Sequence, residues 1–204
     1  MSAPRQTIPS KCLSCSAPLE SPIVCTGCHT LYPVPEKADY FALLRLPRRY
    51  RIDEQELTRA FLSLTRNIHP DYFGAGSEEM RLLAVRLSAE VNDAYRILKD
   101  PVLRAGYLLE CAGGASAASD RSVPPRVLGE VMEIREAIEE AGADAGELRR
   151  IRDRVAGLRA EVLDEIADAA DDLSGAGPED KIRLRSLINS VKYYDNLLSE
   201  LPGA

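Results

Sequence analysis

Four of the five cysteines stand in two C-x-x-C pairs near the start of the chain, Cys12 with Cys15 and Cys25 with Cys28. Two pairs separated by nine residues can supply four thiolates to one tetrahedral zinc ion, because each pair offers two sulfurs from one tight turn. Redox chemistry would call for a single C-x-x-C beside a βαβ unit, and this segment has neither feature. We therefore predict a Zn²⁺ site with a structural role, since four protein ligands leave no open position for substrate.

The segment that holds these cysteines, residues 1–37, is too short to fold on apolar burial alone. A chain of about 30 residues buries little apolar surface, so metal binding would supply the free energy of its folding. His29, which directly follows Cys28, and the isolated Cys111 are interpreted as non-ligands.

A second group of residues that could take part in chemistry or binding is the tripeptide His69-Pro70-Asp71. Pro70 restricts the backbone, and a rigid turn loses little entropy when it binds a partner. The imidazole and the carboxylate on either side offer a donor and an acceptor, although a histidine that only caps the turn is the alternative. The sequence has no nucleophile elbow, Walker-type loop or H-E-x-x-H motif. We therefore expect a docking element and no enzymatic activity of the chain itself.

Two amphipathic helices are predicted on either side of this tripeptide. One covers 53–68, with Asp53 as its N-cap, and the other covers 77–99 and ends at Asp100-Pro101. The apolar residues of the first helix fall on one stripe, so Arg59 and Arg66 project from the other side. These arginines could meet an acidic groove of a partner, although a solvated helix face is the alternative. Together the helices predict an antiparallel hairpin with the tripeptide in its connection.

After a turn-forming linker at 111–126, helical periodicity returns from residue 127 to the end of the chain. Breaks near Gly142 and at 174–178 divide this region into three helices, which predicts a three-helix bundle. Four segments result: 1–37, 38–110, 111–126 and 127–204. The fold class is mainly α, with a small zinc-ribbon-like N-terminal domain. The expected apolar stripes are Leu128, Val131, Met132 and Ile138 in the first helix, Leu148, Ile151, Val155, Leu158, Val162 and Ile166 in the second, and Leu184, Leu187, Val191, Tyr194 and Leu198 in the third.

Composition excludes several classes of function. The net charge is -6, which argues against broad attraction to nucleic acid or to anionic lipid. No stretch reaches the roughly 18 apolar residues of a membrane span, and the N-terminus has no secretory signal pattern. We therefore expect a cytoplasmic protein with no nucleic-acid and no membrane partner.

The middle of the chain resembles a J-domain, the module by which co-chaperones stimulate ATP hydrolysis by DnaK-type chaperones. The resemblance rests on residues 39–44, on the His69-Pro70-Asp71 tripeptide between the two helices, and on the run Asn92–Leu98 followed by 100–104. It implies that His69, Pro70 and Asp71 bind the chaperone, with Arg66 and Arg59 on the adjoining helix. A basic residue often follows the tripeptide in this family, and Tyr72 departs from that pattern.

The whole chain is similar to the HscB family of iron–sulfur cluster co-chaperones. The similarity extends to Leu46-Pro47, to Tyr50–Asp53, to Arg104–Leu109 and to Met132–Glu136, and some members carry an N-terminal zinc domain. It implies that the chain delivers the cluster scaffold protein IscU to a DnaK/HscA-type chaperone. By position, the scaffold-binding residues are Leu128, Met132, Glu133 and Glu136, with a further apolar contact near Leu184–Leu187.

Two other readings remain open at the level of sequence. The same turn would serve a general J-domain co-chaperone that handles unfolded clients. The paired C-x-x-C motifs also occur in zinc-ribbon proteins that bind nucleic acid, although residues 1–37 carry few basic side chains. Whether Leu128 and Met132 belong to the core or to an interface cannot be decided from periodicity.

Overall fold

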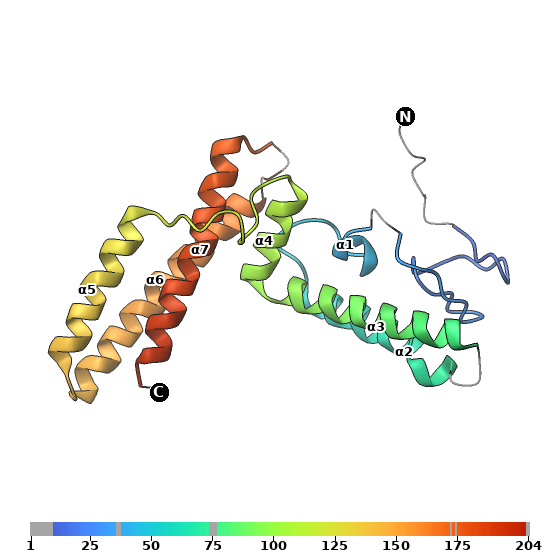
Figure 1. Ribbon diagram of the computed structural model, residues 1–204, viewed down its shortest axis with the longest axis horizontal. Helices are drawn as coiled ribbons and strands as arrows, with labels where there is room; N and C mark the ends of the chain where they lie inside the picture. The colour runs from blue at the N-terminus through green and yellow to red at the C-terminus, as the bar shows by residue number, and fades with distance from the viewer. Residues whose placement is uncertain (1–9, 36–37, 74–76, 172, 174, 203–204) are drawn as a thin grey trace. The chain divides into compact units, whose positions relative to one another are not determined.

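The computed structural model describes residues 10–35, 38–73, 77–171, 173 and 175–202 and contains two compact units (Figure 1). The first unit comprises the chain up to Arg48 together with Ile52–Asp100, and the second comprises Arg49–Arg51 and the chain from Pro101 onward. The helices are α1 (Tyr40–Leu43), α2 (Glu54–Asn67), the 3₁₀ turn η1 (Pro70–Phe73), α3 (Glu78–Lys99), α4 (Pro101–Cys111), α5 (Pro125–Ala141), α6 (Ala145–Asp171) and α7 (Pro178–Glu200).

The described part of the chain has no β-strand, and two isolated bridges, Lys11 with Pro18 and Val24 with Leu31, are its only β-type pairing. The fold is therefore mainly α, as the sequence predicts. None of the helices in the described ranges combines the length and the apolar content that crossing a bilayer requires.

Residues 10–35, named here the tetracysteine module, form two successive turns that each begin with a C-x-x-C pair. In the first turn Ser16 donates its backbone N–H to the carbonyl of Cys12 at 2.9 Å. In the second, His29 does the same to Cys25 at 2.8 Å. Ser16 and His29 both have positive φ, 60° and 57°, so the chain turns back at the same position of each pair. We call these turns the first knuckle (12–17) and the second knuckle (25–30).

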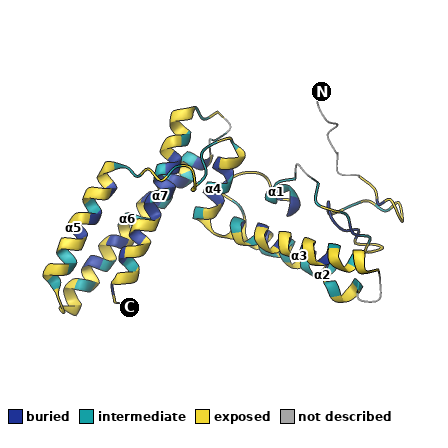
Figure 2. Ribbon diagram, in the orientation of Figure 1, coloured by how far each residue is buried: buried dark blue, intermediate teal, exposed yellow. Residues whose placement is uncertain are grey.

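Helices α2 and α3 pack against each other as the predicted hairpin, and α1 packs on α3. The side chain of Asp53 accepts hydrogen bonds from the first backbone amides of α2, and Ser77 caps α3 in the same way. Buried leucines and alanines on the facing stripes, among them Leu57, Leu64 and Leu87, form the core between the helices. Figure 2 shows how burial follows one stripe of each helix.

The second unit contains the predicted bundle of α5, α6 and α7, to which α4 adds a fourth helix. Helix α5 packs on α6 and α7, and α4 packs on α6 and α7 as well. The predicted stripes of α6 and α7 supply buried residues such as Val155, Ile166, Leu184 and Tyr194. Although α4 lies within the 38–110 segment of the sequence, its buried leucines belong to the core of the second unit.

The chain between α4 and α5 is irregular, but it is fixed to α7 by three polar side chains spaced four residues apart. Lys181 donates from Nζ to the carbonyl of Ala112 at 2.7 Å, and Arg185 donates from Nε to the carbonyl of Ala115 at 2.8 Å. Asn189 donates from Nδ2 to the carbonyl of Ser122 at 2.9 Å. A segment with the composition of a flexible linker is therefore held as part of the second unit.

The buried face of α5 differs from the predicted stripe. Val127, Val131 and Ile134 are buried, whereas Leu128 and Met132 are exposed. The buried residues 127, 131 and 134 are spaced by four and then three positions, as expected for one face of a helix. This face is displaced by one residue from the predicted stripe, which starts at Leu128. Of the predicted stripe, only Val131 is buried; Leu128 and Met132 are exposed, and Ile138 lies at the edge of the core.

Candidate functional site

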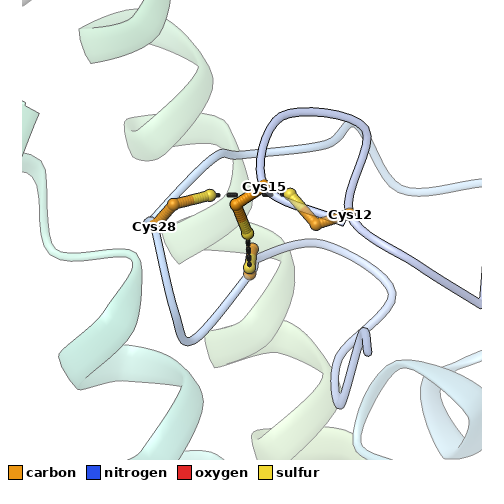
Figure 3. Close-up of side chains that lie close together, drawn as sticks. Cys12, Cys15 and Cys28 are labelled. Carbon is orange, nitrogen blue, oxygen red and sulfur yellow. Dashed lines mark hydrogen bonds between the residues drawn. The ribbon is translucent and has the colours of Figure 1, made fainter. Parts of the chain in front are cut away.

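The four cysteine sulfurs converge in the tetracysteine module (Figure 3). Cys12 Sγ lies 3.5 Å from Cys28 Sγ, and Cys15 Sγ lies 3.7 Å from Cys25 Sγ. All four sulfurs are within 4.8 Å of one another. Four sulfurs at 2.3 Å from a tetrahedral zinc ion are about 3.8 Å apart, so the donor set and its spacing suit such an ion. The sequence-predicted ligands therefore form one cluster that could bind a metal.

The thiols of this cluster differ in their tendency to ionise. The hydroxyl of Tyr32 donates to Cys12 Sγ at 3.2 Å and lowers the pKa of this thiol to about 5. The hydroxyl of Thr30, at 3.1 Å, lowers the pKa of Cys28. Although the amide of Ala17 favours ionisation of Cys15, the neighbouring sulfur of Cys28 and desolvation raise its pKa to about 12. Because clustered thiolates repel one another, full ionisation of the set requires a cation at its centre.

Tyr32 is a supporting residue that the sequence analysis did not identify. Its hydroxyl oxygen accepts a hydrogen bond from the backbone N–H of Leu13 at 2.9 Å while its proton is directed at Cys12. Outer-shell groups of this kind orient metal ligands. A tyrosine four residues after Cys28 carries no signal of such a role in the sequence, because the contact depends on how the two knuckles fold together.

The His69-Pro70-Asp71 tripeptide forms an exposed turn at the end of α2. The His69 side chain is 51% exposed and the Asp71 side chain 89% exposed. Asp71 donates its backbone N–H to His69 Nδ1 at 3.3 Å, and Tyr72 donates its own to the carbonyl of His69 at 3.0 Å. These bonds fix the turn, and a carboxylate oxygen of Asp71 lies 3.5 Å from the same imidazole nitrogen. The imidazole and the carboxylate are therefore available to a partner protein in a defined geometry.

The outer face of α2 carries both sequence-predicted arginines, of which Arg66 stands three residues before His69 and Arg59 ten residues before it. Arg59 and Arg66 are exposed, and they share a face because seven residues make about two helical turns. Arg59 also donates from Nε to the carbonyl of Gln55 at 3.3 Å, which fixes the base of its side chain. Two exposed cationic side chains thus share the face of the helix that ends at the turn.

A separate exposed surface lies on α5. Leu128 is 44% exposed and Met132 is 65% exposed, one helical turn apart, and nothing lies within 4 Å of a side chain that would replace Gly129 between them. Glu136, which follows Met132 by one turn, is exposed, whereas Glu133 pairs with Arg154 at 3.4 Å. We name Leu128, Met132 and Glu136 the α5 strip. These two apolar residues are not part of the core.

The prediction of a further scaffold contact near Leu184–Leu187 is wrong, because these two side chains do not lie on the surface. Leu184 and Leu187 are 0% and 2% exposed and lie in the core of the second unit. On α7 the exposed apolar side chain in this region is Ile182. The position inferred from the family resemblance therefore falls on the buried stripe of the helix.

A rigid His-Pro-Asp turn between two packed helices, with cationic side chains on the preceding helix, defines the class of J-domain proteins. The comparisons with known proteins identify the family more narrowly. Residues 123–202 match a family described as the HSCB C-terminal oligomerisation domain. The chain is 39% identical over 137 residues to the co-chaperone HscB homologue of Azoarcus sp. strain BH72, an alignment that covers 66% of this chain and 77% of the relative.

Two further relatives extend this agreement over most of the chain. The HscB homologue of Bordetella petrii is 36% identical over 170 residues, which are 81% of this chain and 95% of the relative. The crystal structure of the human co-chaperone HscB superposes with a TM-score of 0.75 at 26% identity and covers 93% of this chain and 95% of the human one. The chain belongs to the HscB family of co-chaperones. Membership implies a role in iron–sulfur cluster assembly with an Hsp70-type partner, and co-chaperones are not enzymes in themselves.

Proposed function

We propose that the protein stimulates the ATPase of an HscA-type chaperone, a specialised member of the DnaK class, through its His-Pro-Asp turn. The observation that carries this proposal is the exposed and internally hydrogen-bonded turn formed by His69, Pro70 and Asp71. Because its geometry is fixed before binding, little entropy is lost when it docks. Arg59 and Arg66 extend the same surface with positive charge, which suits an acidic region of the ATPase domain. Nucleotide hydrolysis takes place in the partner.

The second part of the proposal concerns the cargo. We assign the α5 strip, together with Glu133, to binding of the iron–sulfur cluster scaffold protein IscU. Two apolar side chains that are exposed on a helix and flanked by carboxylates match a partner surface with apolar and basic groups. Because one chain carries both the chaperone-binding turn and the scaffold-binding strip, it can deliver IscU to the chaperone.

The metal in this proposal is a structural Zn²⁺ ion held by Cys12, Cys15, Cys25 and Cys28. Four thiolates complete its coordination, so the ion would supply folding free energy to the module and no catalysis. The proposal places the protein in the cytoplasm, where a reducing environment keeps the thiols available to a metal.

The substitution His69→Gln tests the chaperone half of the proposal. It removes the imidazole and retains a side chain of similar polarity at an exposed position. We expect stimulation of the chaperone ATPase to disappear while the affinity for IscU, measured by isothermal titration calorimetry, stays unchanged. Stimulation at the wild-type level by the variant would refute the assignment of the turn.

The substitution Leu128→Glu tests the scaffold half. It replaces an exposed apolar contact by a charge, and we expect the affinity for IscU to fall by at least about tenfold, as for a central interface residue. Val85→Glu on α3 is the matched control, because Val85 is 46% exposed and Leu128 is 44% exposed. If the two variants bind IscU with equal affinity, the α5 strip is not the binding site for IscU. An absence of any binding by the wild-type chain would favour a general co-chaperone for unfolded clients.

A further inference from the structure

A groove of about 540 Å³ separates the tetracysteine module from α2 within the first unit. The module contributes Glu20, Ser21, Val24 and Thr26 to one wall. The opposite wall belongs to α2. Thr26 lies in the second knuckle, directly after the metal-ligand position Cys25, so the metal cluster and the groove share a structural element.

The α2 wall of this groove includes Arg59, one of the two arginines that the proposed function assigns to the chaperone. Arg59, Ser63 and Asn67 line the groove and stand four residues apart, which places them on one side of the helix. Arg66 stands three residues after Ser63 and shares this side. The groove therefore opens onto the same surface that the proposed function assigns to the chaperone.

The second knuckle also reaches the turn itself. The imidazole of His29 stacks on the ring of Tyr72, with centroids 6.4 Å apart and an interplanar angle of 20°. The ring of Tyr72 in turn meets the imidazole of His69 edge-on at 6.3 Å. Tyr72, which replaces the basic residue common in the family, thus lies between the knuckle and the His-Pro-Asp turn.

A further contact, between two residues that line the groove, holds the module in this position. Arg45, whose backbone has a positive φ of 57°, donates from its guanidinium to the carbonyl of Glu20. Two contacts therefore join the module to the rest of the first unit, Arg45 with Glu20 at the groove and Tyr72 with His29 outside its lining. Its lining balances Arg45 and Arg59 against Glu20 and Glu56, which suits a polar protein segment better than a nucleic acid or a lipid.

We propose that the second knuckle forms part of the chaperone-docking surface and that the groove receives a polar segment of the chaperone ATPase domain. This inference rests on the proposed function of the His-Pro-Asp turn. A specific protein interface uses about 800 Å² on each partner, more than an exposed tripeptide and two arginines provide. A partner segment that contacts Arg59 reaches the groove that Thr26 also lines, and one that contacts His69 lies beside Tyr72, on which His29 stacks.

The substitution Thr26→Arg in the full-length chain tests this inference. Thr26 is exposed on the groove wall and is not a metal ligand, so a long charged side chain there obstructs the groove without replacing any residue of the J-domain helices. We expect the concentration of co-chaperone that gives half-maximal stimulation of a purified HscA-type chaperone to rise roughly tenfold, with maximal stimulation retained.

Leu13→Arg is the matched control. Leu13 occupies the same position in the first knuckle, directly after Cys12, is 81% exposed and does not line the groove. We expect this variant to stimulate the chaperone as the wild type does. Bound zinc, measured per chain, verifies that both variants retain the metal cluster. If Thr26→Arg loses zinc, Glu20→Arg on the same wall takes its place with the same expected result.

The outcomes separate this inference from the proposed function. If Thr26→Arg and Leu13→Arg both behave as the wild type while His69→Gln is inactive, the groove is not a docking site and the assignment of the turn remains. If His69→Gln stimulates fully, both proposals fail. A weaker interaction of Thr26→Arg alone supports the groove as part of the docking surface.

Discussion

Tyr32 links the cysteine cluster to the backbone of the first knuckle through one hydroxyl group. It donates to Cys12 Sγ and accepts from the N–H of Leu13, so the same oxygen positions a ligand and the loop that carries it. The hydroxyl also favours the thiolate of Cys12, whose pKa is about 5. Metal affinity should therefore depend on a residue that does not coordinate the ion.

The substitution Tyr32→Phe isolates this contribution. It removes only the hydroxyl, and we expect the affinity for Zn²⁺ to fall roughly 10- to 100-fold, the usual effect of losing an outer-shell partner. Competition with a chromophoric chelator measures the change. Tyr193→Phe on α7, at a tyrosine outside the module, is the control and should leave the affinity unaltered. An unchanged affinity of Tyr32→Phe would show that the hydroxyl does not support the cluster.

At the residue scale, the sequence predicted that the four cysteines would cluster, but it did not predict the residues that contact them. The spacing of two C-x-x-C pairs restricts the sulfurs to one site, and the structure brings all four within 4.8 Å. Tyr32 and Thr30 act through hydroxyl groups whose partners are determined by the path of the backbone between the knuckles. No periodic or spacing rule encodes that path.

At the scale of single elements, α5 has apolar side chains on two faces, one of which is buried and the other exposed. Val127, Val131 and Ile134 are buried against α6 and α7, whereas Leu128 and Met132 are exposed. Because adjacent positions on a helix differ by about 100°, a shift of one residue exchanges core for surface. The sequence has apolar side chains on both faces, so periodicity alone could not determine which of them faces the bundle.

A pair of alanine substitutions tests this assignment through stability. Ile134 is fully buried, and Ile134→Ala should lower the free energy of unfolding by about 2–4 kcal/mol, because it leaves a cavity in the bundle. Met132→Ala removes a side chain from solvent and should change stability by no more than about 0.5 kcal/mol. Urea unfolding followed by circular dichroism measures both. Similar losses of stability would contradict the orientation of α5.

Helix α7 shows a second limit of sequence patterns at this scale. Lys181, Arg185 and Asn189 have the spacing of a solvated polar face, yet they donate to three carbonyl groups of the segment between α4 and α5. Arg185 is 2% exposed. The apolar stripe of α7 was predictable because burial follows the helical period. The hydrogen bonds of Lys181, Arg185 and Asn189 were not predictable, because their acceptors are backbone carbonyl groups of an irregular segment.

At the scale of the whole molecule, the chain carries its two proposed binding surfaces on different compact units. The first unit holds the His-Pro-Asp turn, the cationic face of α2 and the tetracysteine module, and the second unit holds the α5 strip. The two helices of the hairpin, the three helices of the bundle and the resemblance to the family followed from sequence patterns, whereas α1 and α4 were not predicted as separate helices. The groove between the module and α2 did not, because it arises from packing between segments that share no sequence pattern.

Steady-state ATP hydrolysis by an HscA-type chaperone, measured with IscU present, tests the central claim that one chain couples the two partners. We expect the wild-type chain and IscU together to stimulate hydrolysis more than the sum of their separate effects. His69→Gln should abolish this synergy at every IscU concentration, and Leu128→Glu should retain stimulation without IscU but lose the additional gain. Full synergy with either variant would contradict the account.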